Sequence, residues 1–129
     1  MAETIVKIEN LVKRYHELVA VDHFNLTVSK GEILGLLGPN GSGKTTTMNC
    51  LLSLLAYDKG SIEVFGKPMK PDSYDLKRNI GVVFQNVAVF DTLTVQENID
   101  YFCGLYIKDK KLRRQYVAEA VEFAGLSDF

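Results

Sequence analysis

A glycine-rich octapeptide, residues 38–45, has the residue types and the spacing needed to bind a chain of phosphate groups. Its sequence, GPNGSGKT, satisfies the pattern G-x-x-x-x-G-K-S/T. Because glycine has no Cβ, the backbone can wrap closely around phosphates with its N–H groups pointing inward. The lysine adds a cation and the following hydroxyl adds a metal ligand. The segment therefore predicts a polyphosphate site that is built largely from backbone amides.

The side chains at the end of this loop have separate expected roles. Lys44 is expected to lie between the β- and γ-phosphates and to offset the charge that builds up during phosphoryl transfer. The Thr45 hydroxyl is expected to coordinate Mg²⁺, and Thr46 is a candidate for the α-phosphate. A glycine-rich turn that merely caps a helix would not explain the Lys-Thr pair. The residues predicted to bind the nucleotide here are Gly38, Pro39, Asn40, Gly41, Ser42, Gly43, Lys44, Thr45 and Thr46.

A strand and a helix must flank such a loop to hold it in place. The apolar run ILGLL, residues 33–37, predicts a short strand that is buried on both faces. After the loop, Met48, Leu51, Leu52 and Leu55 recur at i, i+3, i+4 and i+7, which predicts a helix with one inward stripe. This strand-loop-helix order is the context that the motif requires.

The remaining pattern predicts an α/β protein. Alternating apolar residues over 4–15 and 19–29 indicate two strands, GSIEVFGKP a brief third, and NIGVVFQ another that ends at Gln85. Residues 72–79 are polar and predict a loop with one helical turn. Strands that alternate with helices indicate a sheet that is at least partly parallel.

Two helices are expected after Gln85. Thr94 lies three residues before Glu97, the spacing of a capping box at the start of an apolar-striped helix. A last helix follows, with one apolar and one charged face. We therefore expect an ATP-binding core over residues 1–86, with an incomplete sheet, and the start of a helical subdomain over residues 87–129. The apolar face of the last helix comprises Leu112, Tyr116, Val117, Ala120, Val121 and Ala124.

Composition excludes several classes of protein. The 129 residues carry a formal net charge of −1, which gives no general reason to expect a nucleic acid or an anionic membrane as a partner. No apolar stretch approaches the roughly 18 residues that a membrane-spanning helix needs, so a cytosolic chain is expected. Cys50 and Cys103 lack metal-ligand spacing and are expected to be buried free thiols. The basic run at 108–115 is expected to be a solvated helix start.

The blocks KGEILGLLGPNGSGKTT, DKGSIEVFGKP, IGVVFQ and LTVQENI, in this order, resemble the first half of an ATP-binding cassette (ABC) ATPase, the nucleotide-binding domain of an ABC transporter. The resemblance extends from about Ile5 to Phe129. It implies a partial P-loop NTPase core of the ABC type, with a β-strand subdomain and the beginning of a helical subdomain. It also implies ATP and Mg²⁺ as cofactors.

The resemblance also implies roles for residues outside the loop. Tyr15 stands where the family usually has an aromatic residue that stacks on adenine, although plain packing at a strand end is the alternative. Gln85 looks like the family's Q-loop glutamine, a catalytic-site residue that reaches the metal and the attacking water. His16 and His23 precede the loop, so neither can be the family's late histidine that senses the γ-phosphate.

By resemblance, the partners are ATP, an integral-membrane permease and a second ATPase subunit in a head-to-tail dimer, with no nucleic acid. The location is the cytoplasmic face of the membrane, reached through the permease. YFCGLY after LTVQENI further resembles the exporter branch. The permease determines the cargo, which these residues do not specify.

Several parts of such an ATPase are not found in these residues. No SGG occurs, and no run of four apolar residues followed by Asp-Glu comes after Gln85. We therefore expect the chain alone to bind nucleotide weakly and to lack meaningful hydrolysis, and we expect ILGLL and IGVVF to be partly uncovered. The alternatives are a non-catalytic nucleotide-binding fragment, a soluble ABC ATPase outside transport, and a small-molecule kinase or GTPase. The small-molecule kinase or GTPase lacks support because no guanine-reading N-K-x-D follows the loop and DKGSIEVFGKP has no place in those families.

Overall fold

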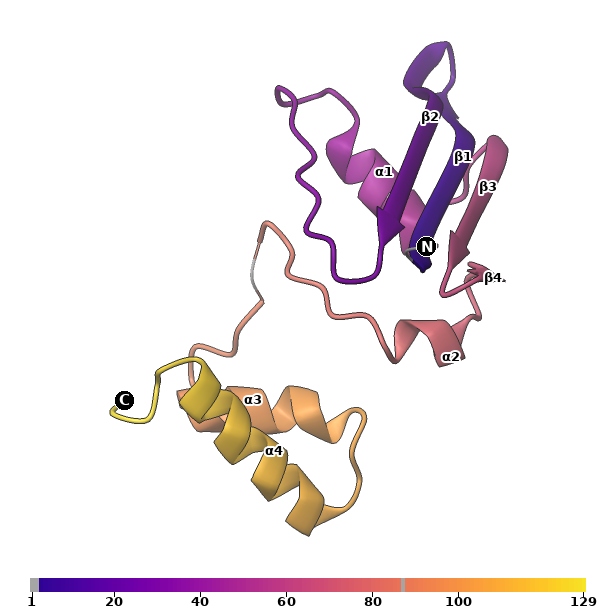
Figure 1. Ribbon diagram of the computed structural model, residues 1–129. Helices are drawn as coiled ribbons and strands as arrows, with labels where there is room; N and C mark the ends of the chain where they lie inside the picture. The colour runs from indigo at the N-terminus through magenta and orange to yellow at the C-terminus, as the bar shows by residue number, and fades with distance from the viewer. Residues whose placement is uncertain (1–2, 87) are drawn as a thin grey trace. The chain divides into compact units, whose positions relative to one another are not determined.

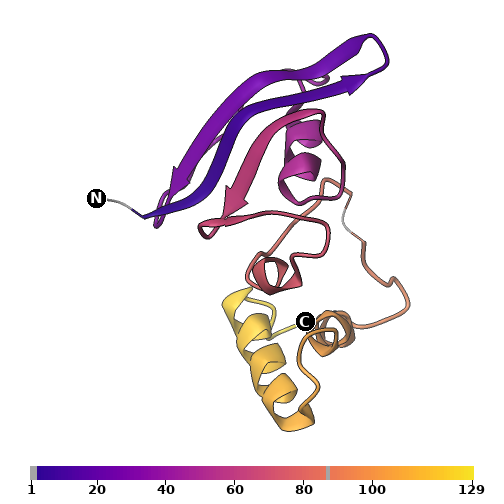
Figure 2. The ribbon, with the colours of Figure 1, turned by 90° about the vertical axis from the view of Figure 1, so that its right-hand side faces the viewer.

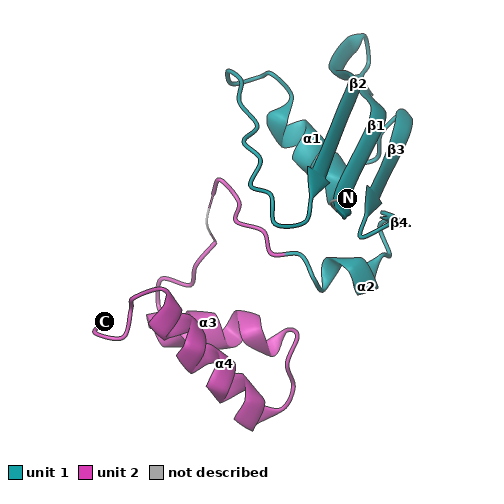
Figure 3. Cartoon of the chain, in the orientation of Figure 1, with its two compact units in different colours: residues 1–80 teal, residues 81–129 magenta. Residues whose placement is uncertain are grey.

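The computed structural model describes residues 3–86 and 88–129, and the chain divides into two compact units. Unit 1 comprises residues 1–80 and unit 2 comprises residues 81–129 (Figure 3). The phosphate loop lies in unit 1, whereas Gln85 lies in unit 2. The expected functional boundary between residues 86 and 87 stays a prediction.

Unit 1 is built on a four-stranded sheet in the order β2-β1-β3-β4 (Figure 1). All of its strand pairs are antiparallel. The first two strands form a long hairpin whose last pair is Tyr15 opposite Leu18. Their β-branched and alternating residues suit a pleated sheet with one covered face. The strands are β1 (Thr4–Tyr15), β2 (Leu18–Ser29), β3 (Lys59–Val64) and β4 (Lys67–Pro68).

The central strand is irregular near its middle, where its pairing with both neighbours shifts register. Asn10 adopts a positive φ of 50°, and its N–H donates to Oδ1 of Asn25, 2.9 Å away. Gly60 faces this point with a φ of 104°, and a Cβ there would lie 2.6 Å from the Asn10 carbonyl oxygen. The absence of a side chain at Gly60 therefore lets β3 follow β1 past the irregularity.

The core of unit 1 lies between the sheet and two helices, α1 (Lys44–Leu51) and α2 (Tyr74–Lys77). Figures 1 and 2 show α1 along one face of the sheet. Cys50 is fully buried in this core, and burial raises the pKa of its thiol above the ordinary range. The buried cluster comprises Ile8, Leu11, Val21, Cys50, Ile62, Val64, Met69 and Leu76.

The predicted helix after the loop exists, but it is shorter than predicted and ends at Leu51. Of the predicted inward stripe, Leu52 is buried and Leu51 and Leu55 pack against the core, whereas Met48 is 43% exposed; Thr47 and Cys50 are buried in addition. The single helical turn expected within residues 72–79 is confirmed as α2.

Two predicted strands are wrong. ILGLL and IGVVF have no strand conformation, and Ile33 and Leu37 are 100% and 94% exposed. A strand exists only when its backbone is paired, and every strand pair in the described residues belongs to the sheet of β1 to β4. The expected parallel pairing is therefore also wrong for the described residues. The exposed apolar side chains agree with the expectation that both runs are partly uncovered, since Ile33, Leu37 and Val83 are exposed while Ile80 packs against the core.

Unit 2 contains two helices, α3 (Val95–Gly104) and α4 (Lys110–Phe123). The capping box is confirmed: Thr94 Oγ1 accepts from the Glu97 N–H, and Glu97 Oε2 accepts from the Thr94 N–H, both at 3.1 Å. An ion pair of 2.9 Å between Arg113 and Asp100 links the helices. On the predicted apolar face of α4, Val117 is buried while Tyr116 remains 44% exposed.

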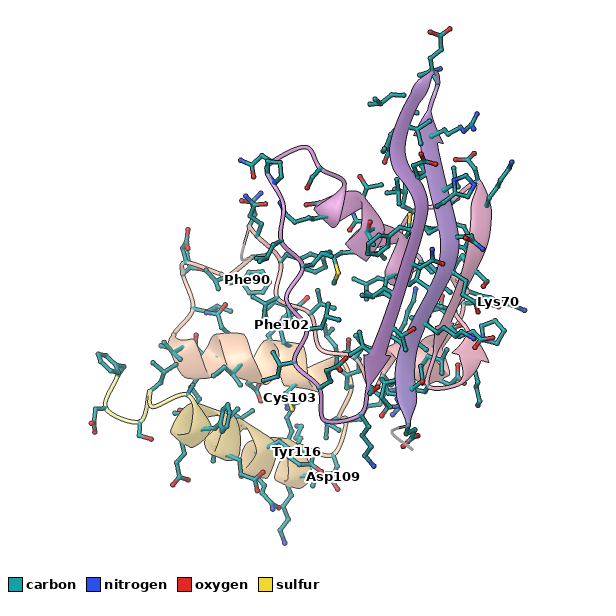
Figure 4. The ribbon with its side chains drawn as sticks, turned by 45° about the horizontal axis from the view of Figure 1, so that its top comes forward. Lys70, Phe90, Phe102, Cys103, Asp109 and Tyr116 are labelled. Carbon is teal, nitrogen blue, oxygen red and sulfur yellow. The ribbon has the colours of Figure 1, made fainter. Side chains whose placement is uncertain are left out.

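An apolar hollow of about 490 Å³ lies between α3 and α4. Figure 4 shows its labelled members Phe102 and Cys103 on α3 and Tyr116 on α4. Cys103 is a free thiol, as expected, and is half-buried.

No helix in the described part of the chain is both long enough and apolar enough to cross a bilayer.

Candidate phosphate-binding site

The phosphate loop, residues 38–43, leads directly into α1, and its glycines adopt backbone conformations that other residues avoid. Gly43 is the N-cap of the helix with a φ of 95°, and Gly41 has a φ of 84°. A turn over residues 39–42 is closed by the Ser42 N–H, which donates to the Pro39 carbonyl oxygen at 3.1 Å. Since residues with a Cβ are strained at such positive φ values, glycine is favoured at both positions.

Close packing imposes a second requirement on two of the glycines. A Cβ on Gly43 would lie 2.6 Å from the Ala20 carbonyl oxygen on β2, and one on Gly38 would lie 2.6 Å from Ser42 Oγ. The first contact is with backbone, which cannot move aside without disturbing the sheet. The bare backbone of Gly43 therefore holds the phosphate loop against β2.

The start of α1 offers backbone amides to a ligand. The first hydrogen bond of the helix runs from the Thr47 N–H to the Gly43 carbonyl oxygen at 2.9 Å, so the preceding amides of the first turn have no partner inside the helix. Among the described residues, no side chain caps this end. Free amides and the positive end of the helix dipole together favour an anion at this position.

Lys44 extends back over the loop that precedes it. Its ammonium donates to the carbonyl oxygens of Gly38 and Pro39, the latter at 3.0 Å, and lies 3.5 Å from Ser42 Oγ. The positive charge is thus held on the loop that leads into the uncapped first turn of α1. An ammonium and free amides can both donate hydrogen bonds to phosphate oxygens, so this arrangement suits a polyphosphate.

A hollow of about 370 Å³ lies between the loop and β2. Its walls combine apolar side chains with the Lys44 ammonium and the Asp22 carboxylate. Asp22 also contacts Nδ1 of His23 at 2.6 Å. The residues that line it include Val19, Asp22, Phe24, Leu37, Lys44 and Thr47.

Tyr15 lies at the end of β1, in the same unit as the phosphate loop. It pairs with Leu18 across the hairpin, and Leu18 is two residues from Ala20, which Gly43 contacts. Two residues of strand span about 7 Å. The tyrosine therefore lies on the hairpin against which Gly43 packs. The residue is 42% exposed, so a ligand can reach it.

The other predicted site residues are placed as follows. Thr45 is exposed and Thr46 is half-buried in the first turn of α1. Gln85 is exposed in unit 2, outside the unit that holds the loop. The structure thus brings residues 38–46 into one site on unit 1, with Tyr15 on the adjoining hairpin, and the individual roles remain predictions.

Two residues beside Tyr15 were not identified from the sequence. Lys13 Nζ lies 5.1 Å from the centroid of the Tyr15 ring. Asp58 Oδ2 accepts from the Arg14 N–H at 2.7 Å and so attaches the end of β1 to the segment before β3. The two-residue spacing of Lys13 and Tyr15, which places them on one side of a strand, could have indicated the first contact. No sequence pattern indicates the second.

Comparison with known proteins identifies relatives over almost the whole chain. The family model described as "ABC transporter" matches residues 21–129. The probable multidrug ABC transporter ATP-binding protein YbhF of Escherichia coli is 34% identical over 96% of this chain and 22% of its own length. The osmoprotectant import ATP-binding protein OsmV of Salmonella typhimurium is 37% identical over 95% of this chain and 34% of its own length.

A solved structure shows the same fold. The cbiO1 protein of Clostridium perfringens, part of the ABC transporter complex cbiONQ, superimposes with a TM-score of 0.86 at 25% identity. The superposition covers 98% of this chain and 52% of cbiO1. This chain thus spans between about a fifth and about half of the length of these three relatives.

Proposed function

Because this chain belongs to the ABC transporter family of ATP-binding domains, we propose that residues 38–46 bind the triphosphate of ATP and that the protein uses ATP binding and hydrolysis to drive transport through a membrane permease. The observation that carries this proposal is the start of α1. There, uncapped amides, the Lys44 ammonium and a glycine backbone packed on β2 meet in one place.

The residues present fit a magnesium-bound triphosphate. The space at the Cβ position of Gly41 is open, so the backbone of the loop can be approached closely at this glycine, and the amides of the first turn of α1 are uncapped. Lys44 is the cation for the β- and γ-phosphates, Thr45 is the hydroxyl ligand for Mg²⁺, and Thr46 binds the α-phosphate. Bound Mg-ATP supplies the phosphoryl group that is transferred to water.

Gln85 and Tyr15 complete the proposed site. Gln85 would contact the metal and orient the attacking water, and Tyr15 would stack on the adenine ring. The exposed Tyr15 ring on the hairpin next to the loop supports the second role. Stacking on an aromatic ring does not require hydrogen bonds to the base, so it contributes affinity with limited base selectivity.

The proposed partners are a membrane permease and a second ATPase subunit, and the proposed location is the cytoplasmic face of the membrane. Support comes from the relative cbiO1, which is part of an ABC transporter complex. The names of the relatives include both a probable multidrug protein and an import protein. We therefore assign the choice of cargo and its direction to the permease.

The test is calorimetric titration of Mg-ATP into the wild-type chain, Lys44→Ala and Lys30→Ala. Lys44→Ala removes the charge next to the amides and is expected to weaken binding at least about tenfold, as for loss of a hydrogen bond to a charged group. Lys30→Ala removes an exposed charge elsewhere in unit 1 and is the matched control. Equal affinities of Lys44→Ala and wild type would refute the site.

A further inference from the structure

We propose that Lys13 is a positioning residue for the adenine base: its ammonium occupies one face of the Tyr15 ring and directs the base to the opposite face. This inference rests on the proposed function, in which Tyr15 stacks on adenine. It adds a residue to the nucleotide site that lies outside the phosphate loop.

The geometry of the contact is the first step. Lys13 Nζ lies 5.1 Å from the centroid of the Tyr15 ring, within the range of about 6 Å for a cation–π interaction. The two residues are separated by one position on β1, so their side chains leave the same side of the strand. Tyr15 remains 42% exposed, so the ammonium does not bury the ring.

The backbone around this pair is held on both sides. The Arg14 N–H donates to Asp58 Oδ2 at 2.7 Å, and the Asp58 N–H donates to the Val12 carbonyl oxygen at 2.8 Å. Tyr15 is held in turn by its pairing with Leu18. These bonds hold the backbone at the end of β1, although its pairing with β2 shifts register on both sides of Lys13.

Lys13 has no salt bridge with the carboxylates of the described residues. The aromatic ring is therefore the contact that the structure gives its ammonium. Lys13 differs in this respect from Lys7, Lys30 and Lys67, each of which pairs with an acidic side chain.

A cation on one face of the ring has two consequences for the other face. It restricts the rotamers of Tyr15, so less conformational entropy is lost when a base stacks. It also draws π-electron density toward itself, which makes the opposite face a better partner for the electron-rich adenine ring. Lys13 therefore raises the affinity for the base without contacting the phosphates.

The experiment compares Mg-ATP with Mg-tripolyphosphate, which has the phosphate chain but no base. Dissociation constants are measured by calorimetry on the full 129-residue chain for wild type, Lys13→Gln, Lys13→Arg, Tyr15→Ala and Arg14→Gln. Arg14→Gln is the matched control, because it removes the same charge one residue away on the other side of the strand. The backbone N–H of residue 14 keeps its hydrogen bond to Asp58 in this variant.

We expect Lys13→Gln to weaken ATP binding about two- to fivefold, in line with an exposed cation–π contact, and to leave tripolyphosphate binding unchanged. Lys13→Arg retains wild-type affinity for both ligands, because a guanidinium also stacks on an aromatic face. Arg14→Gln changes neither ligand. Unchanged tripolyphosphate binding also shows that the phosphate loop of each variant is folded.

Three outcomes overturn the inference. Equal weakening of both ligands by Lys13→Gln means that the lysine attracts phosphate by charge alone. No effect on either ligand means that the ring contact is irrelevant to binding. If Tyr15→Ala leaves the ratio of the Mg-ATP affinity to the Mg-tripolyphosphate affinity unchanged, Tyr15 does not stack on the base. This outcome also refutes the adenine part of the proposed function. A Tyr15→Ala effect without a Lys13→Gln effect refutes the inference alone.

Discussion

Gly43 has two independent reasons to be glycine, and they come from different parts of the chain. Its φ of 95° is a local property of the turn into α1. Its close approach to the Ala20 carbonyl oxygen is a contact with a strand more than twenty positions earlier. A single residue thereby couples the shape of the phosphate loop to its place on the sheet.

Gly43→Ala is expected to destabilise unit 1 and to weaken Mg-ATP binding. The positive φ alone costs about 1–3 kcal/mol for a residue with a Cβ, and the contact of 2.6 Å with the Ala20 backbone adds to this. The free energy of unfolding is measured by urea denaturation, followed by circular dichroism.

Substitutions at Gly41 and Gly35 separate the cost of the positive φ from the cost of the contact with the Ala20 backbone. Gly41→Ala has the positive φ but open space around the new Cβ, so it is expected to show the strain without the clash. Gly35→Ala has neither and is expected to be neutral. If Gly43→Ala were no worse than Gly41→Ala, the contact with Ala20 would have no energetic role.

At the scale of elements, α3 is tied to the segment before it by one side chain. Asn98 Oδ1 accepts from the Phe90 N–H at 2.8 Å, and Nδ2 donates to the carbonyl oxygens of Phe90 and Thr94 at 3.1 and 2.9 Å. The Phe90 ring then meets Tyr101 edge to face, with centroids 4.9 Å apart. Asn98 thus holds the segment before α3 and its aromatic residue against the helix.

Asn98→Ala is expected to reduce the stability of unit 2 by about 1–3 kcal/mol, because it removes the partner of several backbone groups. The direct measurement is hydrogen exchange at the Phe90 amide, which is protected by Asn98 in the wild type. Asn98→Asp keeps the acceptor and loses the donors, so it should preserve part of this protection. Unchanged exchange at Phe90 in Asn98→Ala would contradict the assignment.

For the whole molecule, each unit has its own stabilising contacts. Unit 1 is held by the sheet and α1, and unit 2 by the α3–α4 pair with its ion pair and caps. Apolar side chains such as Ile33, Leu37 and Val83 are at least 90% exposed outside both cores. Contiguous exposed apolar residues promote association, so low solubility is expected for this chain on its own.

The 129-residue chain is expected to bind Mg-ATP weakly and to show no sustained phosphate release. The reason is chemical: the residues hold a loop for phosphates, but neither SGG nor an apolar run followed by Asp-Glu occurs among them to orient and activate water. Phosphate release is followed with a coupled assay, with Lys44→Ala as the background. Sustained turnover that Lys44→Ala abolishes would disprove the expectation.

Signals between neighbours in the sequence predicted the local features correctly. The phosphate-loop motif, the capping box at Thr94 and the helices after it depend on hydrogen bonds and dihedral angles within a few residues of one another. The family was also identified from the residues alone, and comparison confirmed it. The amino-acid pattern by itself was therefore sufficient for the turn into α1, the capping box and the family, whereas the roles of the individual site residues stay predictions.

Tertiary structure decided the features that join distant parts of the chain. ILGLL has the composition of a buried strand, yet strand pairing needs a partner that its own residues cannot supply, and here it remains unpaired and exposed. The contact of Gly43 with Ala20 and the bond of Arg14 to Asp58 likewise follow from how β1, β2 and β3 pack. Helix signals are complete within one segment, whereas sheet and site contacts depend on which segments meet in space, and only the fold determines that.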